Sequence, residues 1–313
     1  MLPAQTGSNP IADAGTGNAL RVSFIIPSYN SGITLPLCLH SIRRQLPAIP
    51  FEVIVADSSD DGTAAAIAAA FPEVRFLHLP SRTNPAAARN RGLEIASAPW
   101  CAFVDADVVL TENWLATALG LLSDEVGGIC SSIEPYPEDN PLGFCYFLIQ
   151  FSMFLPSGIV RRVPVIPSFA FLSKCSDARE AGGFPEDFPI LEDFLFSRRL
   201  TEKTGRAFLF CPAMRAFHIN RRQWGIISKQ LKDHGSWSAR ARRSAPLPGT
   251  FLGKFPAAVP LLVPYRLGLI LARTLRWNPK AFVRAVALSP ILIAGLAIWA
   301  AAFYRETTQG NAH

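Results

Sequence analysis

Between residues 21 and 104, short apolar runs alternate with segments of helical pattern, and this alternation limits the possible folds more than any other feature. An apolar run of four to eight residues bounded by loop residues is typical of a buried strand. Strand and helix in regular alternation predict a parallel, doubly wound α/β sheet. The strands are expected at 21–26, 51–56, 74–79 and 102–104, and the helices at 35–45, 64–71 and 84–97.

Polar residues follow three of the expected strands. Tyr29 and Asn30 come after the first strand, which we expect Pro27 to stop, Asp57 follows the second, and Asp105 and Asp107 follow the fourth. In open α/β sheets ligands bind beyond the carboxyl ends of the strands, so these side chains are expected at one crevice. Neither a G-x-G-x-x-G nor a G-x-x-x-x-G-K-[ST] motif is present, which argues against a dinucleotide oxidoreductase and a P-loop nucleotidase.

The run WCAFVDADVVL, residues 100–110, ends a buried strand in two aspartates one residue apart. Buried carboxylates are costly unless they are paired, hydrogen-bonded or bound to a metal. Mg²⁺ is commonly held by one or two carboxylates together with substrate phosphates. The alternative is a turn in which Asp105 and Asp107 cap the next helix.

Charge is distributed unevenly along the chain of 313 residues, whose net charge is +6. From residue 220 to 284 there are thirteen Lys and Arg and one acid, Asp233, whereas residues 1–219 carry sixteen basic and twenty-two acidic residues. A basic, apolar C-terminal third suits an anionic membrane surface better than nucleic acid. The six scattered cysteines form no C-x-x-C pair, and most of them are expected to be buried thiols in a reducing compartment.

Five segments in order resemble glycosyltransferase family 2, whose members have the GT-A nucleotide-sugar fold. They are FIIPSYN (24–30), VIVADSSDDGT (53–63), NPAAARNRGLEIA (84–96), FVDADV (103–108) and EAGGFPEDFPILEDFLFSRRL (180–200). The resemblance covers roughly residues 20–220. It implies an α/β fold with a mixed, mostly parallel sheet, followed here by C-terminal membrane-associated helices.

By this resemblance, Pro27, Tyr29 and Asn30 line the nucleotide-sugar site, with Tyr29 stacking on the base, and Asp57 hydrogen-bonds the base. Arg89 approaches the diphosphate, although a lone helical arginine is also compatible with a solvated side chain. Asp105 contacts the ribose and the metal, and Asp107 the metal, which is Mg²⁺ or Mn²⁺. Two departures from the family pattern, Ser31-Gly32-Ile33 after the Tyr-Asn pair and Ala56 before Asp57, leave UDP-, GDP- and dTDP-sugars open.

The resemblance also predicts which residues take part in catalysis and acceptor binding. Asp193 is the expected general base of an inverting transfer, with Glu192 holding the acceptor or orienting the base; the alternative is that both acids only favour a helix N-terminus. His218 is an expected further metal ligand, or an ordinary hydrogen-bonded histidine. Arg221, Arg222 and Trp224 resemble an acceptor-binding segment, or form a basic surface turn.

The C-terminal third is expected to associate with a membrane. Residues 223–243 have the pattern of a basic amphipathic helix, and 256–265 that of an interfacial segment. The 19 uncharged residues from Ala285 to Phe303 are long enough to cross a bilayer, with Pro290 as a kink. Basic residues on their N-terminal side predict a cytoplasmic body. A helical hairpin and a buried helix pair are the alternatives.

These observations predict a disordered segment 1–19, a GT-A domain 20–220, interfacial helices 221–280 and a transmembrane helix 281–304. The expected activity is an inverting, metal-dependent glycosyltransferase at the cytoplasmic membrane face, acting on a hydroxyl or phosphate of a lipid or lipid-linked acceptor. The alternatives are a nucleotidyltransferase of similar fold and a non-catalytic, membrane-anchored nucleotide-sugar-binding protein.

Overall fold

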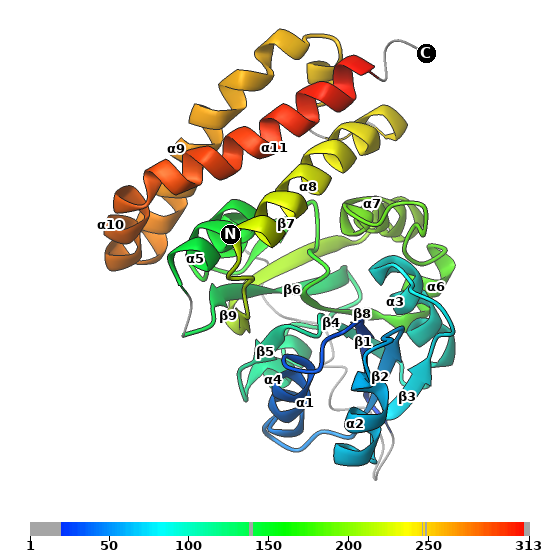
Figure 1. Cartoon of the computed structure of the whole chain (residues 1–313). Helices are drawn as coiled ribbons and strands as arrows, with labels where there is room; N and C mark the ends of the chain where they lie inside the picture. The colour runs from blue at the N-terminus through cyan, green and yellow to red at the C-terminus, as the bar shows by residue number, and fades with distance from the viewer. Residues whose placement is uncertain (1–19, 138–139, 246, 248, 310–313) are drawn as a thin grey trace. The chain divides into compact units, whose positions relative to one another are not determined.

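The computed structural model describes residues 20–137, 140–245, 247 and 249–309, so the segment 1–19 lies outside the described residues. The chain forms two compact units. Unit 1 contains the described residues up to 132 together with 159–185 and 196–216, and unit 2 contains 133–158, 186–195 and 217 onward. Figure 1 labels the elements of both units.

Four parallel strands begin unit 1, as the alternation predicts. They are β1 (Val22–Ser28), β2 (Phe51–Asp57), β3 (Arg75–His78) and β4 (Trp100–Val104), in the order β3-β2-β1-β4. Contrary to expectation, β1 continues through Pro27, which pairs with Ala56. Proline is tolerated there because β4 pairs with β1 only as far as Ile25, which leaves that edge of the strand open.

The helices between these strands are α1 (Leu35–Arg43), α2 (Thr63–Ala70) and α3 (Pro85–Ile95). Helix α3 begins where Asn84 caps it: the Asn84 side chain accepts a hydrogen bond from Ala87 N, and Pro85 occupies the first turn. It packs against β1, and Gly92 permits this contact because a Cβ there would lie 2.5 Å from the Ile25 side chain.

The rest of the sheet contains antiparallel pairs, with β8 running opposite to both of its neighbours. Strand β8 (Ala170–Lys174) pairs with β4 and with β6 (Val126–Pro135); β9 (Ala207–His218) and β5 (Val108–Leu110) complete the order β8-β6-β9-β5. Strand β7 (Arg161–Val163) also pairs with β9, in antiparallel orientation. Helices α4 (Trp114–Leu119) and α6 (Cys175–Glu180) lie between these strands in the sequence.

A cluster of phenylalanines holds the strands of unit 1 to its helical segments. Phe103 on β4 stacks on Phe171 of β8, with ring centroids 4.9 Å apart, and Phe184 stacks on Phe196 at 4.2 Å. The turn before Phe184 is fixed by Asn90 of α3, which donates to Phe184 O and accepts from Phe184 N. Gly183 in that turn has φ of +66° and is crowded by Asn90, so a side chain would not fit there.

The expectation of buried thiols is wrong for two of the six cysteines. Cys101 on β4 and Cys175 at the start of α6 form a disulfide, with Cα atoms 5.3 Å apart. Cys38, Cys130, Cys145 and Cys211 are buried thiols, as expected.

Unit 2 is mainly helical. Its elements are α5 (Pro141–Phe151), η1 (Ser152–Phe154), the start of α7 (Glu192–Thr204), α8 (Trp224–Ser244), η2 (Thr250–Gly253), η3 (Pro256–Leu261), α9 (Leu262–Trp277), α10 (Pro279–Ala287) and α11 (Ser289–Gln309). Residues Phe144 and Phe147 of α5 are buried and form part of the core.

Helices α8 and α11 pack side by side and run in the same direction (Figure 1). A Cβ on Gly295 would lie 3.2 Å from Leu231, whereas one on Gly235 would lie 2.3 Å from the Trp299 carbonyl oxygen. Along the contact, the residue numbers therefore increase in the same direction on both helices, which means that the helices are parallel. Small residues at the crossing allow this close approach of the two backbones.

The expected span from Ala285 to Phe303 is not one continuous helix. Helices α10 and α11 meet at Leu288 with a bend of 72°. Within the described residues, one helical stretch, Pro256–Trp277, is long and apolar enough to cross a membrane, or two if the bent pair counts as one span.

Candidate functional site

The loops after β1 and β2 are joined to each other in unit 1. Asn30, with φ of +49°, donates its backbone N–H to Ser59 Oγ at 2.7 Å and accepts at its side-chain oxygen from Asp60 N. Asp57 is fully buried, and its two carboxylate oxygens accept from the backbone N–H and the hydroxyl of Ser59. Asp57 therefore fixes the conformation of the loop after β2, which the resemblance predicts to bind the nucleotide base.

A further polar group lies at the same strand ends. The hydroxyl of Ser28, the last residue of β1, is buried and has no hydrogen-bond partner within the described part of the chain. Because an unsatisfied buried hydroxyl is unfavourable, this group is suited to bind a polar ligand atom.

Arg82 covers the Tyr29 ring, the expected stacking platform for the base. The guanidinium carbon of this exposed arginine lies 4.7 Å from the ring centroid, which is a cation–π contact. The sequence gives no signal for this contact, because Arg82 lies in an irregular loop between β3 and α3.

Asp105 is paired with Arg89. Arg89 Nη2 lies 2.5 Å from Asp105 Oδ1, and the Arg89 side chain is 2% exposed while that of Asp105 is 28% exposed. The guanidinium also lies over the ring of Phe184. The solvated alternative for Arg89 is therefore wrong, and its direct partner in this structure is the first aspartate of the pair.

Asp107 and Asp105 both lie near α1. Burial raises the pKa of the Cys38 thiol above its ordinary value, and the negative charges of Asp107 and Asp105 raise it further. The two aspartates therefore create a negative field at this end of β4. The alternative in which they cap a helix is wrong, because β5 follows at Val108.

The aspartate pair fits a cation that takes further ligands from a substrate. Within the described residues, no group of three or more His, Cys, Asp or Glu side chains forms a complete metal site. Two partly exposed carboxylates correspond instead to the Mg²⁺ type of site, in which phosphate oxygens and water supply the remaining ligands.

Glu192 and Asp193 begin α7 in unit 2. The preceding residue, Leu191, has φ of +67°, a backbone conformation that is unfavourable for a residue with a side chain and that recurs at functional sites. Glu192 is 7% exposed, and Asp193 Oδ1 accepts from Phe194 N. The position at the helix start fits both expectations, a catalytic pair and a favourable charge at a helix N-terminus.

His218, also in unit 2, is held in one tautomer by Asn220. Its Nδ1 lies 2.8 Å from Asn220 Oδ1, and Asn220 Nδ2 donates to His218 O, which orients the amide. Because an amide oxygen only accepts, Nδ1 is the donor in this contact. A hydrogen bond of this kind is usual for a metal-binding histidine. Asn220 was not predicted from the sequence as the partner of His218, although its position two residues after His218 is a usable signal.

The residues expected to bind the acceptor lie at the start of α8 in unit 2. Arg221 and Arg222 are exposed, and Trp224 is 38% exposed. Unit 1 therefore contains the residues expected to bind the nucleotide and the diphosphate and both expected metal-binding aspartates, whereas Glu192, Asp193, His218 and the acceptor segment belong to unit 2.

Comparison with known proteins gives consistent matches. Residues 23–145 match the family model "Glycosyl transferase family 2". Glycosyltransferase AglE of Haloferax volcanii is 34% identical over 221 residues, covering 67% of this chain and 71% of that protein. Pre-mycofactocin glycosyltransferase of Mycobacterium tuberculosis is 28% identical over an aligned length of 317 positions that covers 90% of this chain. The present chain spans 62% of the length of that relative.

Two solved structures share the fold. The mannosyltransferase PcManGT of Pyrobaculum calidifontis, in complex with GDP-Man and Mn²⁺, has a TM-score of 0.57 at 22% identity and covers 90% of this chain and 86% of its own. TarS 1–349 of S. aureus with UDP-GlcNAc has a TM-score of 0.56 at 17% identity and covers 94% of this chain and 92% of its own. At these identities the similarity concerns the fold.

Proposed function

The chain belongs to glycosyltransferase family 2, and from that premise we propose that it transfers a sugar from a nucleotide-sugar donor to an acceptor with inversion at the anomeric carbon. The observation that carries the proposal is the parallel pairing of β1 with both β2 and β4. This pairing puts Tyr29, Asp57 and the Asp105–Asp107 pair at one edge of the sheet, where α/β folds bind ligands.

The donor diphosphate is proposed to bind at Asp105 and Asp107 through Mg²⁺ or Mn²⁺. His218, which belongs to unit 2, remains a predicted metal ligand. When bound, the cation would neutralise the negative charge that develops on the leaving nucleoside diphosphate. Arg89 holds the Asp105 carboxylate in place through its buried ion pair. The Mn²⁺ complex of the similar mannosyltransferase supports this part of the proposal.

The nucleotide base is proposed to stack on Tyr29, with Ser28 and the loop around Asp57 as its polar neighbours. Similar folds bind GDP-Man and UDP-GlcNAc, and GDP, UDP and dTDP donors all remain candidates for this chain.

Asp193 is proposed as the general base that takes the proton from the acceptor hydroxyl as its oxygen attacks the anomeric carbon. Positioned proton transfer contributes about 10²–10⁴-fold to the rate. Glu192 is proposed to orient the acceptor or the base. Arg221, Arg222 and Trp224 are proposed to contact the acceptor, which is a lipid or lipid-linked molecule at the cytoplasmic face of a membrane. The exposed apolar side chains of unit 2, among them Phe251, Phe255 and Tyr265, support the membrane location.

The decisive experiment is a thermal-shift screen of the full chain with UDP, GDP and dTDP, each with Mn²⁺ and with a chelator. One nucleotide is expected to raise the melting temperature in the presence of metal, because a ligand that binds only the folded state stabilises it. The variant Asp107→Asn is expected to lose the metal-dependent part of this shift and about 10²–10³-fold in sugar transfer.

The matched control is Asp124→Asn, since the Asp124 side chain is 99% exposed and pairs with Lys174 rather than with site residues. This variant is expected to behave like the parent chain. Equal shifts for parent and Asp107→Asn, with and without chelator, would reject the assignment of the metal to this aspartate pair.

A further inference from the structure

Unit 2 keeps an apolar stripe exposed along α9 and the turn before it. The exposed positions follow the three- and four-residue spacing of one helix face: Leu261, Tyr265, Gly268, Ala272 and Leu275. Helix α10 adds Val283, which is 67% exposed, and η2 adds Phe251 at 59%. Exposed apolar side chains at regular spacing form a contiguous face, and such faces mark contacts with partners or membranes.

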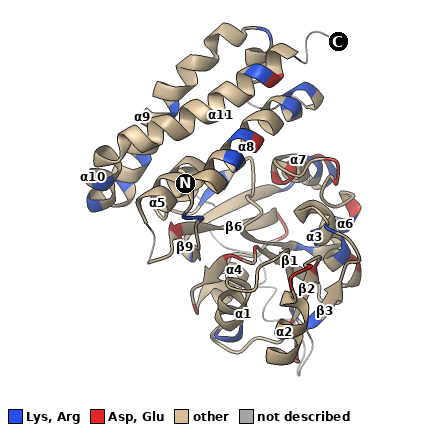
Figure 2. Cartoon of the chain, viewed as in Figure 1, with Lys and Arg blue, Asp and Glu red and all other residues tan. Residues whose placement is uncertain are grey.

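Basic residues accompany this face, and acids are absent from the sequence around it. The 71 residues from His234 to Tyr304 contain nine Lys and Arg and no Asp or Glu. Lys254, Arg276 and Lys280 are exposed beside the apolar positions. Figure 2 shows blue without red along α9 and α10. Apolar and aromatic side chains combined with an acid-free basic rim are complementary to a bilayer with anionic lipids.

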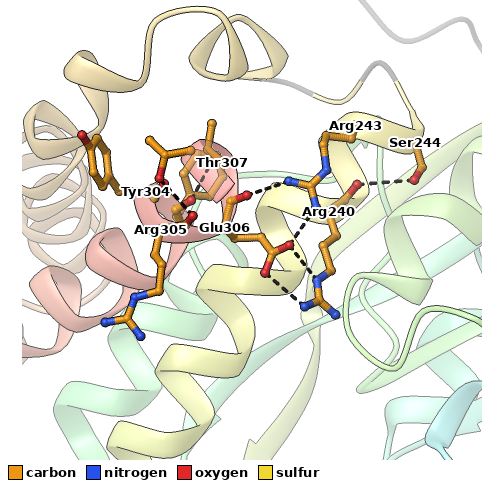
Figure 3. Close-up of polar contacts among 9 residues, drawn as sticks. Arg240, Arg243, Ser244, Tyr304, Arg305, Glu306 and Thr307 are labelled. Carbon is orange, nitrogen blue, oxygen red and sulfur yellow. Dashed lines mark hydrogen bonds and ion pairs between the residues drawn. The ribbon is translucent and has the colours of Figure 1, made fainter. Parts of the chain in front are cut away.

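Helix α11 is fastened to α8 along its length. Its buried side includes Leu292, Leu296 and Phe303. At its far end Glu306 accepts from Arg243 Nη2 at 2.7 Å and lies 3.0 Å from Arg240 Nε, and Arg243 also donates to the Glu306 backbone oxygen (Figure 3). From Gly295 to Glu306, α11 thus lies along the charged helix α8.

The helix α8 is unsuited to the interior of a bilayer. Its exposed side carries Lys232 and the ion pair of Lys229 with Asp233, 2.8 Å apart. Because α8 and α11 are parallel and each 21 residues long, a bilayer crossed by α11 would also enclose these charges. Charged side chains at the centre of a bilayer are strongly unfavourable.

We infer that the face formed by η2, η3, α9 and α10 docks flat on an anionic bilayer, and that α11 stays beside α8 instead of crossing. This departs from the expectation of a span between Ala285 and Phe303. The inference rests on the proposed membrane location and is independent of the sugar-transfer chemistry.

Vesicle flotation of the full chain tests the docking. Binding to vesicles of phosphatidylcholine mixed with phosphatidylglycerol is expected, with much weaker binding to phosphatidylcholine alone. Arg276→Gln with Lys280→Gln is expected to weaken binding about 30-fold, since each basic residue near an anionic surface contributes about fivefold. Equal binding to both vesicle types, or to neither, would overturn the inference.

The apolar part is tested with Tyr265→Glu combined with Leu275→Glu. Both side chains are exposed, so the fold is expected to persist, whereas vesicle binding is expected to fall at least about tenfold. The control is Ile159→Glu, which changes an equally apolar, 78% exposed residue of unit 1 and is expected to leave binding unchanged. Equal losses in both variants would contradict docking through this face.

Crossing is tested on membranes from expressing cells. Alkaline carbonate is expected to release the chain, because it strips surface-bound proteins and leaves spanning ones; retention would overturn the inference. The nucleotide-induced thermal shift separates the two proposals. A shift without vesicle binding leaves the transferase proposal standing and rejects the docking. Vesicle binding without any shift leaves the docking standing and rejects the transferase proposal.

Discussion

At the residue scale, the Glu192–Asp193 pair begins a helix directly after a residue with unfavourable backbone geometry. The positive φ of Leu191 fixes where α7 starts, and it therefore fixes the backbone from which both carboxylates project. Asp193 already accepts from Phe194 N, so its side chain has a defined orientation before any acceptor binds.

Asp193→Asn is expected to lower kcat by about 10²–10⁴-fold, because an amide can accept the Phe194 hydrogen bond but cannot take a proton. The nucleotide-induced thermal shift is expected to stay at the parent value. Steady-state transfer assays measure the first effect, and Asp187→Asn, an exposed acid of the same unit, is the control. Unchanged kcat would remove Asp193 from the catalytic assignment.

His234 on α8 is expected to make unit 2 sensitive to acid. Burial lowers the pKa of His234 to about 4; the charge of Asp233 opposes this shift and that of Arg266 adds to it. In the unfolded chain a histidine has a pKa of about 6.5. Between these two values the unfolded state binds more protons, so the free energy of unfolding falls as the pH is lowered, by up to about 1.4 kcal/mol per pH unit.

Melting temperatures at pH 7 and pH 5 check this prediction. His234→Gln is expected to reduce the acid-induced decrease, whereas His78→Gln, at an exposed position of unit 1, is expected to leave it unchanged. Glu306 does not account for this window, because its hydrogen bonds and ion pairs with Arg240 and Arg243 hold its pKa below the ordinary value of 4.5. The same decrease in His234→Gln as in the parent would contradict the assignment.

At the scale of elements, α8 offers a matched pair of glycines. A Cβ on Gly235 would lie 2.3 Å from the Trp299 carbonyl oxygen, which cannot move without shifting α11, whereas Gly225 has nothing within 4 Å. Gly235→Ala is therefore expected to destabilise unit 2 by about 1–3 kcal/mol. Gly225→Ala is expected to be neutral or stabilising by about 0.5–1 kcal/mol.

Urea denaturation of the two variants measures the difference. If Gly235→Ala were as stable as Gly225→Ala, the close contact between α8 and α11 would be wrong, and the inference that α11 stays beside α8 would lose its support.

Local sequence patterns predicted most of the individual helices and strands, but not how these elements pair and pack with one another. The pattern of residues 223–243 predicted α8, which runs from Trp224 to Ser244. Pro290 was interpreted as a kink inside a span, whereas the structure has it in the first turn of α11, where the missing N–H is harmless. Composition alone does not distinguish these two uses of proline.

At the scale of the whole molecule, the family and the fold were predicted from the sequence, and the comparisons confirm both. The position of Tyr29, Asp57 and Asp105 after strands at one edge of the sheet followed from the parallel strand order, which the helices between successive strands impose. The antiparallel strands were less predictable, because β8 pairs with β4 and β6, both distant in sequence. The contact of Arg82 with Tyr29 was not predictable, since it joins two irregular loops.

Hydrogen exchange with and without nucleotide and Mn²⁺ is expected to give different results for the two units. Protection should increase in unit 1 at residues 28–31, 57–60 and 105–108, because ligand binding suppresses local opening there. Residues 251–309 of unit 2 should exchange at an unchanged rate. Protection centred on residues 251–309 would place the nucleotide elsewhere and contradict the proposed site.

The common direction of α8 and α11 has a topological consequence. A polypeptide that leaves one helix at its end and later lies beside it, pointing the same way, must first travel back over the full length of that helix. Residues 245–288 make this return journey, and the exposed stripe of α9 belongs to it. Any homologue that shortened this return path would have to reverse its final helix, and would lose the surface proposed to dock on a bilayer in the same event.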